Sequence, residues 1–201
     1  MIIGFAGLAG SGKTTAARVL EEEMDFRRLP FAKPLKDMAY AFGLTLREVA
    51  GDLKESPCAA LCGATPRQFM QRLGTEFGRQ MIGEDLWVEA WKRAVEVERL
   101  DAIASFCEAD PPVFIVVDDV RFPNEVAAIE ALGGVVVRIE RAGAGSASGG
   151  GHASEAVAGL GLTQVIVNGD LEEFQSEVLR LVRCAIAAEE FRRMHDGNAA
   201  A

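Results

Sequence analysis

The sequence predicts a three-layer α/β/α fold in which helices cover both faces of a five-stranded parallel sheet. Short apolar segments alternate with amphipathic helical segments along the chain, which is the pattern of strand–helix–strand units. The first apolar segment, residues 1–6, leads into a glycine-rich turn and then into a helical segment at 14–24. A later segment, residues 112–117, is continuously apolar and rich in β-branched residues, as expected of a central strand buried on both faces.

The first elements follow from periodicity and turn residues. Residues 1–6 are expected to form the first strand, and the helix at 14–24 places Ala17, Leu20 and Met24 on one face. A second strand is expected at 26–31, with a turn at Pro30.

The region between the second and third strands is predicted to be helical over about 75 residues, far more than an ordinary crossover needs. Helix starts are indicated at Lys33-Pro34, at Thr45 with Glu48, at Thr65-Pro66 and at Asp85, and a loop is expected at 51–63. We interpret residues 33–110 as an insertion into a core formed by 1–32 and 111–194. An insertion of this length in an α/β fold usually builds a binding site.

The second half of the chain returns to the strand–helix alternation. The strand at 112–117 ends in Asp118-Asp119, Pro123 begins a helix capped by Gly133-Gly134, and a fourth strand is expected at 135–139. The sequence around 141–153 is rich in glycine and serine. A fifth strand at 163–167 and a long helix at 171–194 complete the predicted domain.

Composition narrows the classes of function. The 201 residues carry a net charge of −9 without a block of Lys and Arg, which argues against binding to polymeric nucleic acid. No apolar stretch is long enough to span a membrane, and no signal-peptide pattern opens the chain, so we expect a cytoplasmic protein. Cys58 and Cys62 are four apart but lack a second Cys/His pair at ligand spacing, which favours reduced thiols over a zinc site.

The segment Gly7-Leu8-Ala9-Gly10-Ser11-Gly12-Lys13-Thr14 matches G-x-x-x-x-G-K-[ST], the phosphate-binding loop. In such a loop the backbone N–H groups surround the phosphates, the lysine reaches the β- and γ-phosphates and the threonine hydroxyl binds Mg²⁺. The alternative is a glycine-rich turn that matches by chance, but the strand before it and the helix after it favour function. The predicted ligands are a nucleoside triphosphate and Mg²⁺, and the residues predicted to bind the triphosphate are Gly7, Gly10, Ser11, Gly12, Lys13, Thr14 and Thr15.

Carboxylates follow the third strand as in a Walker B motif. Asp118 is predicted to be a second magnesium residue beside Thr14, and the alternative is a solvated strand end. Because neighbouring residues of a strand face opposite ways, we expect one of Asp118 and Asp119 to reach the site.

Three arginines are candidates for phosphate contacts. Arg121 could hold a phosphate with two hydrogen bonds, or it could form a surface ion pair with Glu125. Arg138 and Arg141 lie at the entry to the glycine-rich segment, which we interpret as a lid that closes over phosphates. The alternative is a surface loop whose arginines pair with acidic neighbours.

Two further pairs have competing interpretations. Trp87 and Trp91 are four residues apart on one helix, where core packing is commoner than stacking on a base. His152 and Glu155 follow the glycine-rich segment, where a loop histidine and a first-turn helix carboxylate are the plainer readings.

Several separated motifs together resemble the deoxynucleoside monophosphate kinases of tailed bacteriophages and prophages. The resemblance extends from about residue 2 to residue 182. Besides the phosphate-binding loop, the matching motifs are Phe31-Ala32-Lys33-Pro34-Leu35-Lys36-Asp37, Arg67 with Gln71-Arg72-Leu73-Gly74-Thr75-Glu76, Asp85-Leu86-Trp87-Val88, Asp119-Val120-Arg121 with Asn124-Glu125, and His152-Ala153-Ser154-Glu155.

The resemblance implies transfer of the γ-phosphoryl group of ATP to a deoxynucleoside monophosphate, with Mg²⁺. We expect catalytic roles for Lys13, Arg121 and Arg141. The oligomeric state stays open, with a homodimer as one option. The residues expected to bind the acceptor substrate are Lys36, Arg67, Gln71, Trp87, Asp119, Arg121, Arg138 and Glu155.

Two departures from the family pattern are visible. Relatives often carry Asp directly after the loop lysine, where this chain has Thr14, a more ordinary magnesium ligand. The glycine-rich segment 142–151 contains no basic residue, which leaves open whether Arg138 or Arg141 meets the transferred phosphoryl group.

Two other classes of function compete with this interpretation. Another small-molecule kinase of the same fold, such as a phosphomevalonate or dephospho-coenzyme A kinase, would share the phosphate-binding loop. A nucleotide-dependent switch of the GTPase type would need Asn-Lys-x-Asp after a late strand, and Asn168-Gly169-Asp170 lacks the lysine.

Overall fold

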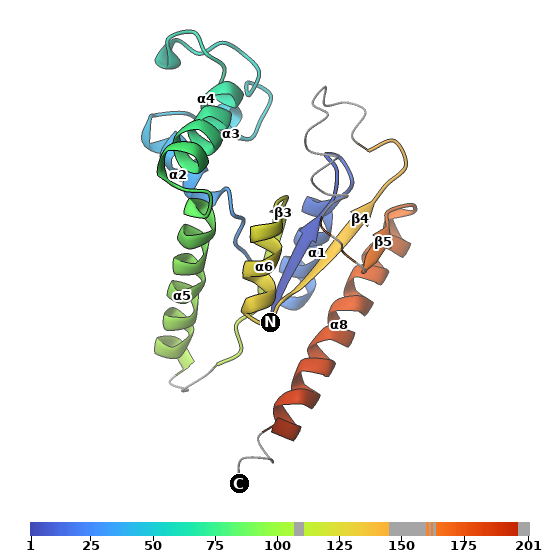
Figure 1. Cartoon of the computed structure of the whole chain (residues 1–201). Helices are drawn as coiled ribbons and strands as arrows, with labels where there is room; N and C mark the ends of the chain where they lie inside the picture. Colours follow the sequence, from blue (N-terminus) through green and yellow to red (C-terminus); the bar gives the residue numbers. More distant parts are fainter. Residues whose placement is uncertain (107–110, 145–159, 161, 163, 197–201) are drawn as a thin grey trace. The chain divides into compact units, whose positions relative to one another are not determined.

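The structure, a computed structural model, describes residues 1–106, 111–144, 160, 162 and 164–196 (Figure 1). The chain divides into two compact units. The first contains Met1–Pro30 and Glu96–Ala201, and the second contains Phe31–Val95.

The first unit is built on a parallel sheet of five strands in the order β2-β3-β1-β4-β5, which confirms the predicted fold class. Strand β1 is central and is buried along its whole length. The carboxyl ends of parallel strands meet at one edge of the sheet, so the segments that follow β1, β3 and β4 come together there. The strands are β1 (Ile2–Ala6), β2 (Arg27–Arg28), β3 (Ile115–Val120), β4 (Val135–Glu140) and β5 (Val165–Val167).

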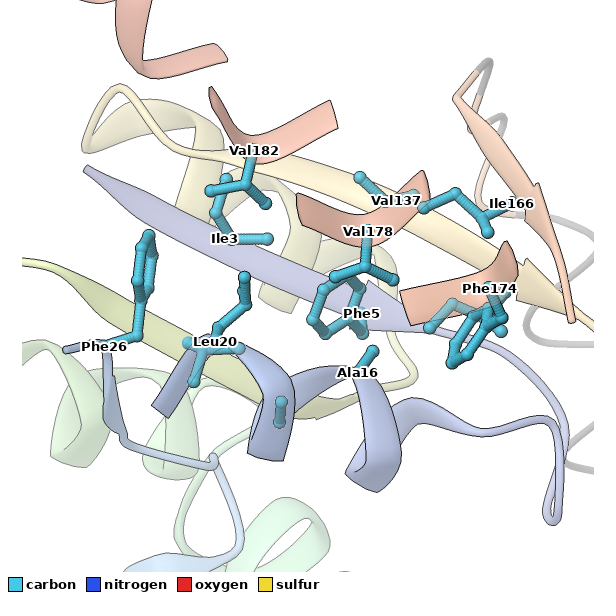
Figure 2. Packing of buried hydrophobic residues seen from close by; sticks show 13 residues of the cluster. Ile3, Phe5, Ala16, Leu20, Phe26, Val137, Ile166, Phe174, Val178 and Val182 are labelled. Atoms are coloured by element: carbon cyan, nitrogen blue, oxygen red, sulfur yellow. The ribbon is translucent and has the colours of Figure 1, made fainter. Parts of the chain in front are cut away.

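Helices cover both faces of this sheet. Helices α1 (Lys13–Met24) and α8 (Leu171–Asp196) pack on one face, where Phe5, Leu20 and Phe174 belong to one buried cluster (Figure 2). Helix α6 (Pro123–Ala131) packs on the other face, so closely that a Cβ added to Gly4 would lie 2.7 Å from Cδ1 of Ile129. The small residue in β1 therefore sets the distance between the sheet and α6.

Strand β3 differs from the sequence prediction. The expected strand at 112–117 is observed as Ile115–Val120, so Asp118 and Asp119 lie inside the strand and not after it. Aspartate is rare in strands, so the end of the apolar run predicts an end of the strand before Asp118. The pairing with β1 shifts between Gly4 and Ala6, where three steps along β3 match two along β1. This irregularity is a β-bulge, a feature that redirects side chains.

The second unit is helical among its described elements, as the sequence predicts. Its buried cluster consists of Ala39, Leu44, Val49 and Met70. The helix expected to start at Thr65-Pro66 extends to Ile82, because α4 continues as the π-helix η2. The elements are α2 (Lys33–Ala41), α3 (Leu46–Val49), the short 3₁₀-helix η1 (Ala59–Leu61), α4 (Pro66–Arg72), η2 (Leu73–Ile82) and the first part of α5 (Leu86–Phe106).

None of the helices in the described part of the chain combines the length and the apolar character needed to cross a bilayer.

The core of the first unit makes a stability prediction. Leu20 is completely buried, whereas Leu171 at the start of α8 is 55% exposed. Leu20→Ala should lower the free energy of unfolding by about 2–5 kcal/mol, because it leaves a cavity in a packed core. Leu171→Ala should change it by less than about 0.5 kcal/mol. Urea denaturation followed by circular dichroism measures both; equal losses would contradict this account of the core.

Candidate functional site

The segment between β1 and α1 has the geometry of a phosphate-binding loop. Gly12, directly before α1, has φ 110°, a left-handed backbone conformation that favours glycine. A Cβ on Gly7 would clash with the carbonyl oxygen of Ile139 in β4. The first turn of α1 carries no acidic residue. No acidic side chain of this turn therefore competes for the backbone N–H groups at the start of α1. These N–H groups are suited to bind an anion.

Lys13 is held over the loop by backbone oxygens. Its ammonium group donates to the carbonyl oxygens of Gly7 at 2.6 Å and of Leu8 at 2.7 Å. These bonds give the partly buried ammonium two hydrogen-bond acceptors. A bound phosphate would give the same donors a charged acceptor, which makes a stronger hydrogen bond.

Thr14 and Asp118 form the candidate magnesium site. The Thr14 hydroxyl donates to the Asp118 carboxylate at 3.2 Å. Mg²⁺ prefers oxygen ligands and is usually bound through one or two protein groups together with substrate phosphates. The described residues contain no group of three His, Cys, Asp or Glu able to hold a metal alone. The donor set therefore fits a magnesium ion that arrives with phosphates.

Arg28 is a member of this site that the sequence analysis missed. Its guanidinium lies 3.5 Å from the same Asp118 carboxylate and 3.0 Å from the carboxylate of Glu21. Arg28 is the last residue of β2, which pairs with β3. The sequence around Arg28 gives no local sign of this role, because its partner Asp118 is 90 residues later in the chain (118 minus 28).

Charges from three residues act on the Lys13 ammonium. The pKa of Lys13 is lowered to about 8: burial lowers it most and the positive charge of Arg121 lowers it too, whereas the carboxylates of Asp118 and Asp119 raise it. Arg121, Asp118 and Asp119 therefore share one electrostatic environment with the loop lysine. Asp118 also contacts Thr14; which of the two aspartates serves a magnesium ion stays a prediction.

Glu125 positions Arg121 through the backbone. Its buried carboxylate accepts from the N–H groups of Arg121 at 2.7 Å and Phe122 at 3.1 Å. This backbone role differs from the surface ion pair between Glu125 and the Arg121 guanidinium that the sequence suggests as an alternative. These two bonds cap the start of α6. The sequence indicates such a cap through the proline at the first position of the helix and Glu125 at the third.

A cavity of about 410 Å³ opens beside the phosphate loop. Its lining includes Leu8, Ser11, Val167 and the two arginines expected near the lid. Arg138 forms an ion pair with Glu140 at 2.7 Å, as in the alternative interpretation, while its buried Nε has no hydrogen-bond partner within the described structure. The buried Ser11 hydroxyl also lacks one there. Two unsatisfied polar atoms in one cavity wall make a polar ligand favourable.

The second unit contains four of the predicted substrate-binding residues. Arg67 is exposed and paired with Glu55, Gln71 is exposed, and Lys36 is half-buried on α2. Trp87 is buried and donates from its indole nitrogen to the Gly74 carbonyl at 2.8 Å, with its ring packed on Gly78 of η2. This is the packing role that the sequence analysis weighed against substrate contact; the proposed contacts of all four with substrate stay predictions.

The remaining predicted residues are divided between the loop and the lid. Thr15 is half-buried in the first turn of α1, and Gly10 is exposed at the tip of the loop with φ 79°. Arg141 is exposed at the cavity. His152, Glu155 and most of the predicted lid lie outside the described residues.

Comparison with known proteins identifies relatives of this chain. No family model matches it. It is 31% identical over 188 residues to a protein of Acanthamoeba polyphaga mimivirus named “Putative deoxynucleotide monophosphate kinase”, covering 90% of this chain and 96% of that protein. It is also 34% identical over 61 residues to the deoxynucleoside-5'-monophosphate kinase of Escherichia phage T5, covering 30% of this chain and 20% of that protein.

The lowered pKa of Lys13 predicts a pH dependence for ATP binding. In magnesium-free buffer with EDTA, the affinity for ATP should fall as pH rises through about 8, because the free protein loses the ammonium charge that attracts phosphate. Above that pH, binding should take up a proton, since ATP favours the charged form. Titration calorimetry in buffers of different ionisation enthalpy measures both quantities. Lys13→Met should bind weakly with no such pH dependence, and a wild-type affinity that is flat from about pH 7.5 to 9.5 would contradict the prediction.

Proposed function

The chain belongs to the deoxynucleotide monophosphate kinase family, and from this membership we propose that it transfers the γ-phosphoryl group of ATP to a deoxynucleoside 5'-monophosphate, giving the diphosphate and ADP. The observation that carries the proposal is the extent of the likeness to the mimivirus protein, which covers 90% of the chain. The phosphomevalonate, dephospho-coenzyme A and GTPase alternatives have no comparable support.

The donor half of the reaction rests on the phosphate loop. We assign the loop backbone and Lys13 to the triphosphate, because the lysine ammonium already lies against the loop carbonyls. Thr14 and Asp118 would hold the magnesium ion. When bound, Mg²⁺ neutralises charge on the β- and γ-phosphate oxygens. Phosphoryl transfer depends mainly on positioning and on such charge neutralisation.

The acceptor half is proposed from charged residues. Arg121 is assigned to the acceptor phosphate, because its charge acts on Lys13 and Glu125 fixes its backbone. Lys36, Arg67, Gln71, Trp87, Asp119, Arg138 and Glu155 are proposed as further acceptor-binding residues, and Arg141 as the arginine that meets the transferred group. An acceptor phosphate is already an anion, so the reaction needs no strong general base. A cytoplasmic location and a homodimer stay predictions.

The activity is tested with a panel of acceptors at constant ATP. The panel contains dAMP, dGMP, dCMP, dTMP, their ribose counterparts, phosphomevalonate and dephospho-coenzyme A, and ADP release is measured. At least one deoxynucleoside monophosphate should be phosphorylated. Lys13→Ala should lower kcat by about 100-fold or more, because it removes a preorganised cation from the transition state. Lys92→Ala, which loses only a surface pair with Glu89, is the matched control. Near-normal turnover by Lys13→Ala in a folded protein would exclude the assignment.

The magnesium assignment predicts different effects for the two aspartates. Asp118→Asn should raise the Mg²⁺ concentration for half-maximal activity by about tenfold, since it removes an anionic partner of Thr14. Asp119→Asn should change mainly the KM for the monophosphate. Initial rates measured against free Mg²⁺ and against acceptor separate the two effects. The reverse assignment would hold if Asp119→Asn alone raised the magnesium requirement.

A further inference from the structure

Asn168, the residue directly after β5, has a buried polar side chain with no role so far in the site. It is 9% exposed, and the sequence analysis considered it only as part of an incomplete GTPase motif. Burying an amide is costly unless it is hydrogen-bonded. Its partners therefore indicate what the residue does.

The Asn168 amide is bonded to the phosphate loop. Its Nδ2 donates to the carbonyl oxygen of Ser11 at 2.8 Å, across 157 positions of sequence. Its backbone N–H donates to the carbonyl oxygen of Glu140, the last residue of β4, at 2.7 Å. One residue thus joins the phosphate loop to the ends of two neighbouring strands.

The packing around this bond is tight. A Cβ added to Gly12 would clash with Nδ2 of Asn168. Gly12 therefore has two reasons to be glycine: its left-handed φ of 110° and the asparagine amide against its α-carbon. The amide and the loop are fitted to each other.

This bond fixes the orientation of one peptide group in the loop. The carbonyl of Ser11 and the N–H of Gly12 belong to the same peptide, and in a trans peptide these groups point in opposite directions. Holding the carbonyl toward Asn168 therefore turns the Gly12 N–H away from Asn168. Without the bond, the buried carbonyl would lack its partner and the peptide could rotate to find another.

We propose that Asn168 is a positioning residue that fixes the Ser11–Gly12 peptide of the phosphate loop for triphosphate binding. The proposal deepens the proposed function and rests on it, because it assumes that the loop binds ATP. It separates Asn168 from residues that contact the acceptor. Loss of the bond should weaken ATP binding and leave the KM for the monophosphate unchanged.

Two variants of nearly unchanged shape test the hydrogen bond. Asn168→Leu keeps the volume without a donor or a charge, and Asn168→Asp keeps the shape without a donor. Both should weaken binding of the ATP analogue adenylyl imidodiphosphate by about tenfold, the effect of one lost hydrogen bond that leaves a buried acceptor. Amide hydrogen exchange at Gly12 should quicken in both without nucleotide. Asn168→Leu with wild-type affinity would show that the side chain only fills space, and would overturn the proposal.

A neighbouring variant controls for general loss of stability. Asp170 accepts from the N–H groups of Glu172 at 2.9 Å and Glu173 at 3.1 Å, which caps the start of α8. Asp170→Ala should lower Tm but keep the affinity for the analogue. A loss of affinity in Asp170→Ala equal to that in Asn168→Leu would overturn the proposal.

A measurement on the unaltered protein covers the case in which the variants do not fold. The side-chain amide protons of Asn168 should exchange with solvent at least about tenfold more slowly than those of a free asparagine amide; equal rates would overturn the proposal. The proposed function fails separately. Wild-type protein that binds the analogue through Asn168 but phosphorylates no monophosphate would refute the kinase assignment and leave this inference intact.

Discussion

The parallel pairing of β1 with β3 on one side and with β4 on the other is the constraint on which the site depends. It brings the carboxyl ends of three strands to one edge of the sheet, so that the phosphate loop after β1 lies beside the carboxylates of β3 and the arginine of β4. These carboxylates and this arginine are all distant from the loop in sequence. Which charged side chains meet at this edge therefore depends on the register of the strands. The apolar residues on both faces of the sheet maintain that register.

At that edge the structure balances charges of both signs around one partly buried ammonium. Lys13 lies between an arginine that lowers its pKa and two aspartates that raise it, and burial has the largest effect. Asp118 has two further partners, the Thr14 hydroxyl and the Arg28 guanidinium. Lys13 and Asp118 thus each have partners within the protein: two loop carbonyl oxygens for the ammonium, and a hydroxyl and a guanidinium for the carboxylate.

The sequence was sufficient for the features that local patterns determine. The loop, the alternation of strands and helices, and the helical region after Pro30 all follow from motifs or periodicities within about 20 residues. The β3 bulge, the pairing of Arg28 with Asp118 and the bond from Asn168 to Ser11 could not be predicted in this way, because each depends on segments that are distant in sequence. The packing of the Trp87 ring on Gly78 of η2 was not predictable either, because a single glycine does not specify such a partner.

The bulge in β3 makes this segment sensitive to chain length as well as to residue type. In a regular strand a one-residue insertion or deletion reverses the facing of every side chain beyond it. In β3 the extra residue determines which way the side chains of Asp118 and Asp119 face relative to β1. It also shifts the backbone that leads to Arg121. Among natural or designed variants, substitutions in this strand can be judged one side chain at a time. A change of length would instead exchange the polar and apolar faces at the edge where the charges meet, and it would do so without altering the composition of the site.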